Sequence, residues 1–85
     1  MNSTCTGRFW QLFNALPVEV QELARKNHQL WLEDQRHPSL RFKLLQGKIW
    51  SIRVGDHYRA LAEVEGRQVT WIWIGHHSEY DRLIR

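Results

Sequence analysis

The residues best suited to chemistry lie near the C-terminus, in the run IGHHSEYDRL from Ile74 to Leu83. The run places two adjacent histidines, His76 and His77, shortly before Tyr80. Histidine exchanges protons near neutral pH, so a single imidazole within reach of a reacting group can serve as a general acid or base. A tyrosine three residues after His77 would lie on the same side of a helix that begins there. The run is therefore a candidate site for proton transfer.

The same run has two other interpretations, a metal site and a helix cap. Adjacent histidines normally point in different directions, and neither H-x-x-x-H nor C-x-x-C spacing is present, so we expect no metal site and no cofactor. As a cap, Ser78 would begin a last helix over residues 79–84, with Asp81 at the capping-box position. Capping accounts for Ser78 and Asp81 but leaves His77 and Tyr80 unexplained.

A second candidate group consists of basic side chains in and beside the predicted strands. Arginine suits phosphate because its planar fork donates two parallel hydrogen bonds. Arg53 and Arg59 lie in the middle of otherwise apolar strands, where an arginine either serves a functional surface or pairs with a carboxylate. The alternative is a solvated sheet face with surface ion pairs, and the residue types leave both open. The group comprises Arg41, Lys43, Lys48, Arg53 and Arg59.

The composition limits the class of protein that could carry these groups. The 85 residues make one small domain spanning 1–85, and the 5 tryptophans argue against disorder. A net charge of +3 is compatible with a nucleic acid or an acidic protein partner. The single cysteine, Cys5, excludes a disulfide framework. Without a signal peptide or the roughly 18 apolar residues of a membrane span, we expect a cytoplasmic protein with no membrane contact.

The elements that must position the candidates follow from hydrophobic periodicity. Residues 1–7 are small and polar and are expected to be loose, and the aromatic-rich stretch Arg8–Phe13 is predicted to form a strand. Residues 15–34 show one apolar face at helical spacing, which only Asn27 interrupts. Three alternating segments follow, at 49–54, 57–64 and 69–74, with turns at Gly47, Gly55 and Gly66. Their short links favour antiparallel hairpins, so the sequence predicts an α+β domain.

Three pieces of the chain, HPSLRFKLLQG, WSIRVGDHYRAL and WIWIGHHSEYDRLI, occur in the order typical of one family. From about Arg8 to Ile84 the chain resembles the RelE/ParE superfamily of small bacterial toxins from type II toxin–antitoxin systems. The resemblance implies a curved antiparallel sheet of four to five strands, an N-terminal helix or short helical pair on one face, and a short C-terminal helix. Members commonly carry two helices before the sheet, whereas only Pro17–Arg36 is expected to be helical here.

The resemblance also implies function, and the superfamily divides by target. RelE-like members act as ribonucleases on mRNA in the ribosome, ParE-like members poison DNA gyrase, and a cognate antitoxin covers the active surface. The favoured expectation is a metal-independent endoribonuclease that cleaves mRNA and arrests translation. The alternative is a non-catalytic gyrase inhibitor or an inactive domain with the toxin fold.

For the ribonuclease, the matching positions receive separate roles. Lys43, Arg53 and Arg59 would bind phosphate, and His77 would transfer a proton. Tyr80 would stack on a base or orient the phosphate. Arg41 and Lys48 extend the expected phosphate-binding group.

Overall fold

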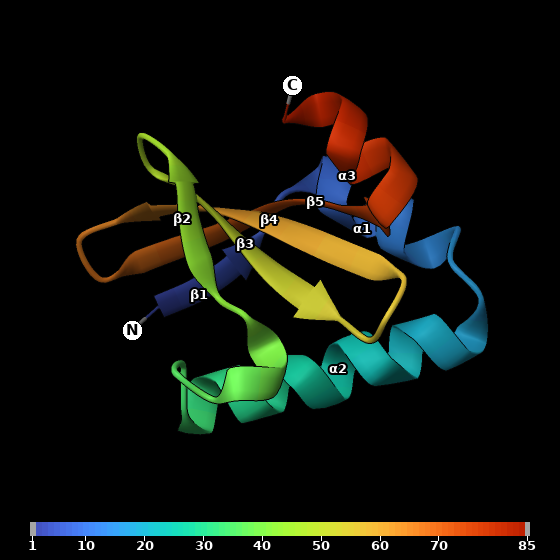
Figure 1. Cartoon of the computed structure of the whole chain (residues 1–85), viewed down its shortest axis with the longest axis horizontal. Helices are drawn as coiled ribbons and strands as arrows, with labels where there is room; N and C mark the ends of the chain where they lie inside the picture. Colours follow the sequence, from blue (N-terminus) through green and yellow to red (C-terminus); the bar gives the residue numbers. More distant parts are fainter. Residues whose placement is uncertain (1, 85) are drawn as a thin grey trace.

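The computed structural model describes residues 2–84 and arranges them as helices packed on a mixed sheet (Figure 1). The predicted α+β class is confirmed. All three turn glycines have positive φ angles, as expected for tight turns between strands. In chain order the elements are β1 (Asn2–Cys5), α1 (Gly7–Asn14), α2 (Val18–Glu33), a 3₁₀ turn (Pro38–Leu40), β2 (Lys43–Gln46), β3 (Ile49–Val54), β4 (Tyr58–Glu65), β5 (Gln68–His76) and α3 (His77–Leu83).

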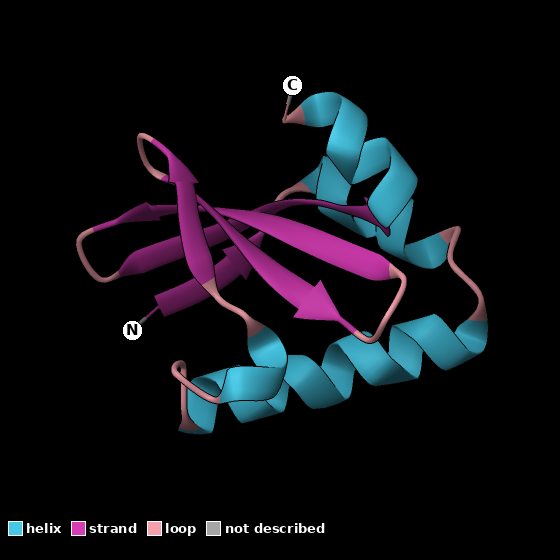
Figure 2. Cartoon of the chain, in the orientation of Figure 1, coloured by secondary structure: helices cyan, strands magenta, loops and turns pink. Residues whose placement is uncertain are grey.

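The sheet has the strand order β1-β5-β4-β3-β2, and the four strands from β2 to β5 pair antiparallel. β1 pairs parallel with β5, so the prediction of a wholly antiparallel sheet is wrong at this edge. α2 and α3 lie on opposite sides of the sheet (Figures 1 and 2). In the described part of the chain, no helix is long and apolar enough to cross a membrane.

The prediction of a loose N-terminus over residues 1–7 is wrong for every residue of it that the structure describes; Met1 lies outside the described range. Asn2–Cys5 forms β1, and the backbone N–H of Asn2 donates to the carbonyl of Arg67 at 2.9 Å. The free edge of β5 supplies these backbone partners, so the pairing does not depend on apolar side chains in β1. Composition alone could not reveal it.

The predicted first strand, Arg8–Phe13, is a helix, α1. Thr6 caps it, because its Oγ1 accepts a hydrogen bond from the backbone N–H of Phe9 at 3.1 Å. Phe9 and Phe13 are four residues apart and both are buried, which is helical spacing. Two helices, α1 and α2, therefore precede the antiparallel strands β2 to β5, so the expected departure from the superfamily pattern does not exist.

The core lies between α1, α2 and the inner face of the sheet. Trp31 is 0% exposed and packs edge-on against Trp71, with ring centroids 5.4 Å apart. Asn27, the polar residue on the apolar face of α2, donates its amide to the carbonyl of Arg53 at 3.1 Å. This bond ties α2 to β3 and explains why an asparagine interrupts the apolar face.

A half-buried histidine, His28, links α2 to this core and makes stability depend on pH. His28 stacks on Trp31, and its Nε2 lies 3.0 Å from Ser3 Oγ, which also accepts the indole N–H of Trp71. Burial lowers the pKa of His28 below its ordinary value of 6.5. The unfolded chain therefore takes up this proton at a higher pH than the folded chain does. The free energy of unfolding should fall as the pH drops below 6.5, then level off below the lowered pKa.

We expect His28→Gln to reduce this acid sensitivity, as measured by urea unfolding in steps from pH 7.5 to pH 5, a range chosen to bracket the ordinary histidine pKa of about 6.5. The other titrating groups are common to both proteins, so the difference between the two curves isolates His28. Parallel curves for wild type and variant would show that His28 contributes nothing to the pH dependence.

Candidate functional site

Strand register gathers basic side chains on the face of the sheet opposite α1 and α2. Arg53 on β3 lies directly across from Arg59 on β4, which lies across from Gly75 on β5. In the neighbouring row, Lys43 on β2 faces Ser51 on β3. Residues opposite one another in a ladder point to the same side, and so do residues two apart on one strand. Lys43, Arg53 and Arg59 therefore share one face.

The two arginines differ in their partners. Arg53 bonds the carboxylate of Asp56 through Nη2 and the carbonyl of Gly55 through Nε at 2.9 Å. Arg59 donates from Nη1 to the carbonyl of Tyr58 at 2.8 Å. Within residues 2–84, no carboxylate lies within ion-pairing distance of Arg59. We call Arg53, Arg59 and Gly75, which lie side by side across β3, β4 and β5, the arginine row. Arg59 is the arginine of this row whose charge remains available to bind an anion.

Gly75 is the third residue of this row and has no side chain, so the indole of Trp73 lies against its Cα. A Cβ at Gly75 would lie 2.6 Å from the ring of Trp73, so only glycine allows the indole to lie across β5 at this point. Trp73 is partly exposed and sits on the same face, opposite Leu61. Apolar residues occupy both sides of β5, yet Trp73 is not enclosed in the core. The structure instead gives the basic face a partly exposed aromatic ring.

Tyr80 anchors α3 on this face. It is 6% exposed, and its hydroxyl donates to Ser51 Oγ at 3.4 Å. A ring buried in this way cannot stack on a nucleobase unless α3 moves, so the expected stacking role does not fit the structure. Tyr80 can instead hold α3, and with it His77, in place beside the arginine row.

His77 begins α3 directly after β5. Its backbone N–H donates to the carbonyl of His57 at 2.8 Å, which extends the β4–β5 ladder by one more pair. Arg59 is two residues from His57, so the Arg59–His77 pair is a diagonal one with Cα atoms about 7–8 Å apart, within reach of long side chains. The His77 side chain is 43% exposed, and its Nδ1 lies 3.7 Å from the carboxylate of Asp81. The register thus brings His77 close to the arginine row.

The cap of α3 is His76, which corrects the prediction that Ser78 fills this position. His76 Nδ1 accepts the backbone N–H of Ser78 at 3.2 Å and lies 3.0 Å from its Oγ. An imidazole nitrogen thereby takes the role that a hydroxyl or carboxylate oxygen usually plays at a helix start. Asp81 faces His77 one turn along α3 and forms no capping box.

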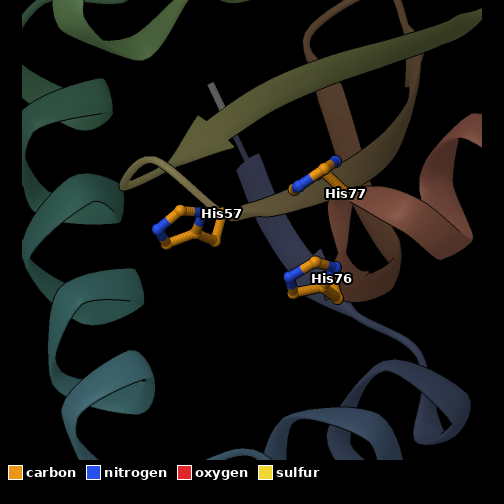
Figure 3. A group of neighbouring side chains, drawn as sticks. All are labelled: His57, His76 and His77. Carbon is orange, nitrogen blue, oxygen red and sulfur yellow. The ribbon is translucent and has the colours of Figure 1, made fainter.

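The structure places a third histidine, His57, beside the adjacent pair. His57, His76 and His77 each offer a ring nitrogen, and these atoms all lie within 4.8 Å of one another (Figure 3). The rings of His76 and His77 are 4.5 Å apart at 32°, so the expectation that adjacent histidines diverge is wrong. Sequence reasoning missed His57, because only the register of β4 on β5 brings it next to residues about twenty positions away.

Two of the predicted phosphate-binding residues stand apart from this face. Lys48 lies in the turn at the opposite end of β3 from Arg53 and bonds Glu65 at 3.0 Å. That hydrogen bond and the charge of Glu65 raise the pKa of Lys48, which is committed to an ion pair. Arg41 is exposed and follows the 3₁₀ turn with a positive φ of 47°. The structure does not bring Lys48 into the site, and it gives Arg41 no contact there.

Comparison with known proteins gives one family. The model of the ParE-like toxin domain matches residues 18–82. No curated protein has a sequence that matches the chain. The matched range covers α2, β2 to β5 and most of α3, which includes every residue of the arginine row and the histidine cluster.

Solved structures share the fold over nearly the whole chain. A chain of the RelB–RelE antitoxin–toxin complex from Methanococcus jannaschii is 20% identical, with a TM-score of 0.73 over 93% of this chain and 96% of that one. The YoeB/ParE toxin from Agrobacterium tumefaciens is 16% identical, with a TM-score of 0.71 over 91% and 99%. The isolated RelE toxin from E. coli is 19% identical, with a TM-score of 0.67 over 99% and 98%. At these identities the likeness establishes the fold, which includes α1 and β1.

Proposed function

Because the chain belongs to the family of ParE-like toxin domains, we propose that it is the toxin of a type II toxin–antitoxin system and cleaves mRNA as a metal-independent endoribonuclease. The observation that carries the ribonuclease activity is the position of His77 beside Arg59, whose guanidinium has no carboxylate partner in the described chain. A cation free to bind phosphate next to a proton-transfer group supplies two of the functions that RNA cleavage requires.

The proposed reaction is attack of an RNA 2′-hydroxyl on the adjacent phosphorus. The new P–O bond forms as the bond to the 5′-oxygen breaks, so the products are a 2′,3′-cyclic phosphate and a free 5′-hydroxyl. Extra negative charge develops on the non-bridging oxygens in the transition state. Arg59 would donate hydrogen bonds to these oxygens, with Arg53 and Lys43 supplying further positive potential on the same face.

His77 would carry one of the two proton transfers. It would either take the proton from the 2′-hydroxyl or give one to the departing 5′-oxygen. Asp81, 3.7 Å from Nδ1, favours an orientation in which Nε2 is presented to the substrate. Tyr80 supports this arrangement as a positioning residue, because it fixes α3 on Ser51.

A substrate base would find its stacking partner in Trp73 rather than Tyr80. The indole is partly exposed on the basic face, whereas Tyr80 is buried. Aromatic rings recognise single-stranded RNA by stacking on unstacked bases, and Trp73 lies one row from Arg59. This arrangement suits an extended mRNA strand presented by the ribosome.

The proposed protein partner is a cognate antitoxin that covers the basic face in the resting cell. Complexes of RelE toxins with RelB antitoxins are known from Methanococcus jannaschii and E. coli. An antitoxin segment that neutralises Lys43, Arg53 and Arg59 would need acidic side chains, and its release would expose the site to mRNA in the cytoplasm.

Induced expression in bacteria tests the proposal directly. We expect growth arrest, with new mRNA 5′ ends that carry a free hydroxyl, detected by mapping transcript ends before and after induction. Co-expression of the antitoxin encoded next to the gene should suppress both effects. Growth arrest with DNA-damage signalling and no new 5′ ends would identify a gyrase inhibitor instead. Normal growth with intact mRNA would identify an inactive domain.

A further inference from the structure

Three imidazoles meet at one corner of the molecule, where β4 begins, β5 ends and α3 starts (Figure 3). Their ring centroids are 4.5 Å apart for His76 and His77, and 6.2 Å apart for His57 with each of the others. The proposed RNA cleavage uses only His77. Proton transfer therefore leaves the convergence of the other two rings unexplained.

Both histidines of the adjacent pair have a polar partner at Nδ1. Asp81 lies 3.7 Å from Nδ1 of His77, and Ser78 Oγ lies 3.0 Å from Nδ1 of His76. Metal-binding histidines typically donate their second ring N–H to a carboxylate or another oxygen, which fixes the ring and makes the ligating nitrogen more basic. These contacts leave Nε2 as the available nitrogen on both rings.

Ligation through Nε2 of His76 requires a change of tautomer. In the metal-free chain Nδ1 accepts the backbone N–H of Ser78, so a neutral ring carries its hydrogen on Nε2. When a metal binds Nε2, the hydrogen moves to Nδ1 and needs an acceptor, and Ser78 Oγ is already in place. Metal binding would therefore exchange the hydrogen bond from the Ser78 backbone N–H to Nδ1 for one from the Nδ1–H to the Ser78 hydroxyl.

The spacing is close to that of a metal centre. Ligand nitrogens of a tetrahedral zinc site with bonds of about 2.0–2.1 Å lie about 3.3 Å apart. One nitrogen of each ring lies within 4.8 Å of one nitrogen of each of the other two, so these three atoms would have to approach by at most about 1.5 Å. His57 is exposed in the turn before β4, and no side-chain hydrogen bond of the described chain restrains it, so its ring can rotate inward.

We propose that His57, His76 and His77 form a three-histidine site for a divalent transition-metal ion, with Zn²⁺ as the physiological candidate. Three neutral imidazoles suit zinc, copper or nickel and do not suit magnesium or calcium, which prefer oxygen ligands. The site leaves a fourth position open to water. The nearby carboxylate of Asp81 offsets part of the added positive charge.

Metal binding has a consequence that rests on the proposed ribonuclease function. A zinc ion on Nε2 of His77 occupies the nitrogen that would transfer a proton, and it holds the ring away from the substrate. The metal-bound form should then be inactive toward RNA, so zinc would act as an inhibitor of the toxin.

Calorimetric titration of the full chain without a histidine tag, using zinc chloride in a non-chelating buffer, tests the site itself. We expect one ion per chain. His57→Ala and His76→Asn should each weaken binding more than about 100-fold, because even the outer partners of metal ligands are worth about 10- to 100-fold. Asparagine at position 76 retains a helix-capping oxygen, so this variant separates ligation from folding.

His37→Asn is the matched control. His37 also accepts the backbone N–H of a serine two residues later, Ser39, at 3.2 Å, but it lies outside the cluster. Its replacement should leave zinc affinity unchanged. Equal weakening by His37→Asn and His76→Asn, or full affinity in His57→Ala, would overturn the site.

RNA cleavage with and without zinc, scaled to the metal-free rate of each protein, tests the inhibition separately. Zinc should inhibit the wild type and spare His57→Ala. Zinc binding by a chain that cleaves no RNA would refute the proposed function and leave the metal site standing. RNA cleavage by a chain that binds no zinc would refute the metal site and leave the proposed function standing.

Discussion

Replacing His77 by glutamine is expected to slow RNA cleavage by about 10²- to 10⁴-fold, the usual contribution of a positioned general acid or base. Glutamine fills a similar volume and keeps hydrogen-bonding capacity but cannot exchange a proton near neutral pH. The measurement is the single-turnover rate of cleavage of ribosome-bound mRNA, followed as a function of pH. One limb of the wild-type plot of cleavage rate against pH should be absent in the variant. A merely structural role for His77 would not remove a limb.

Folding should not be the cause of this loss. The contact that joins His77 to β4 is made by its backbone N–H, which any residue other than proline supplies. The side chain is 43% exposed, so we expect the free energy of unfolding to change by no more than about 0.5 kcal/mol. Full growth arrest on expression of the His77→Gln variant would contradict the ribonuclease mechanism and favour a toxin that acts by binding a protein.

The hydrophobic pattern predicted the elements that bury one face and failed where structure depends on partners elsewhere in the chain. The period of α2 and the alternation of β3 to β5 are intrinsic to each segment, because each hides one stripe or face in the core. β1 has no such pattern and exists because β5 offers it a free edge. In α1, the aromatic residues Phe9 and Phe13 suggested a strand, whereas their spacing of four already indicated a helix.

The sequence could predict those parts of the candidate site that depend on residues within a single strand. The sequence singled out Arg53 and Arg59 because they stand in otherwise apolar strands, and the register sets them directly opposite each other. Two features that the sequence did not predict also depend on strand register. The register brings His57 next to His77, and it places Lys48 away from the arginines. A turn at Gly55 and antiparallel pairing are local signals, but the exact pairing of β4 with β5 includes a bulge that no local signal reveals.

Replacing Arg59 by glutamine is expected to slow cleavage by about 10²- to 10³-fold, as the loss of one donor to a developing oxyanion does. The same change should leave the fold as stable as before or slightly more stable, because like charges directly opposite each other in a sheet repel. Arg53 has Asp56 to neutralise it, and Arg59 has no carboxylate partner among residues 2–84. Urea unfolding and single-turnover cleavage on the same preparations measure both effects.

The matched control is Lys48→Gln, which removes one positive charge from the opposite end of β3 and leaves Glu65 unpaired. If the basic face acts only through net charge, both variants should slow cleavage alike, and their difference from the wild type should shrink at high ionic strength, where salt screens the charges. If Arg59 contacts the reacting phosphate, Lys48→Gln should cleave at the wild-type rate while Arg59→Gln stays slow at every salt concentration. A variant that loses stability but keeps activity would show that Arg59 supports the sheet and takes no part in the chemistry.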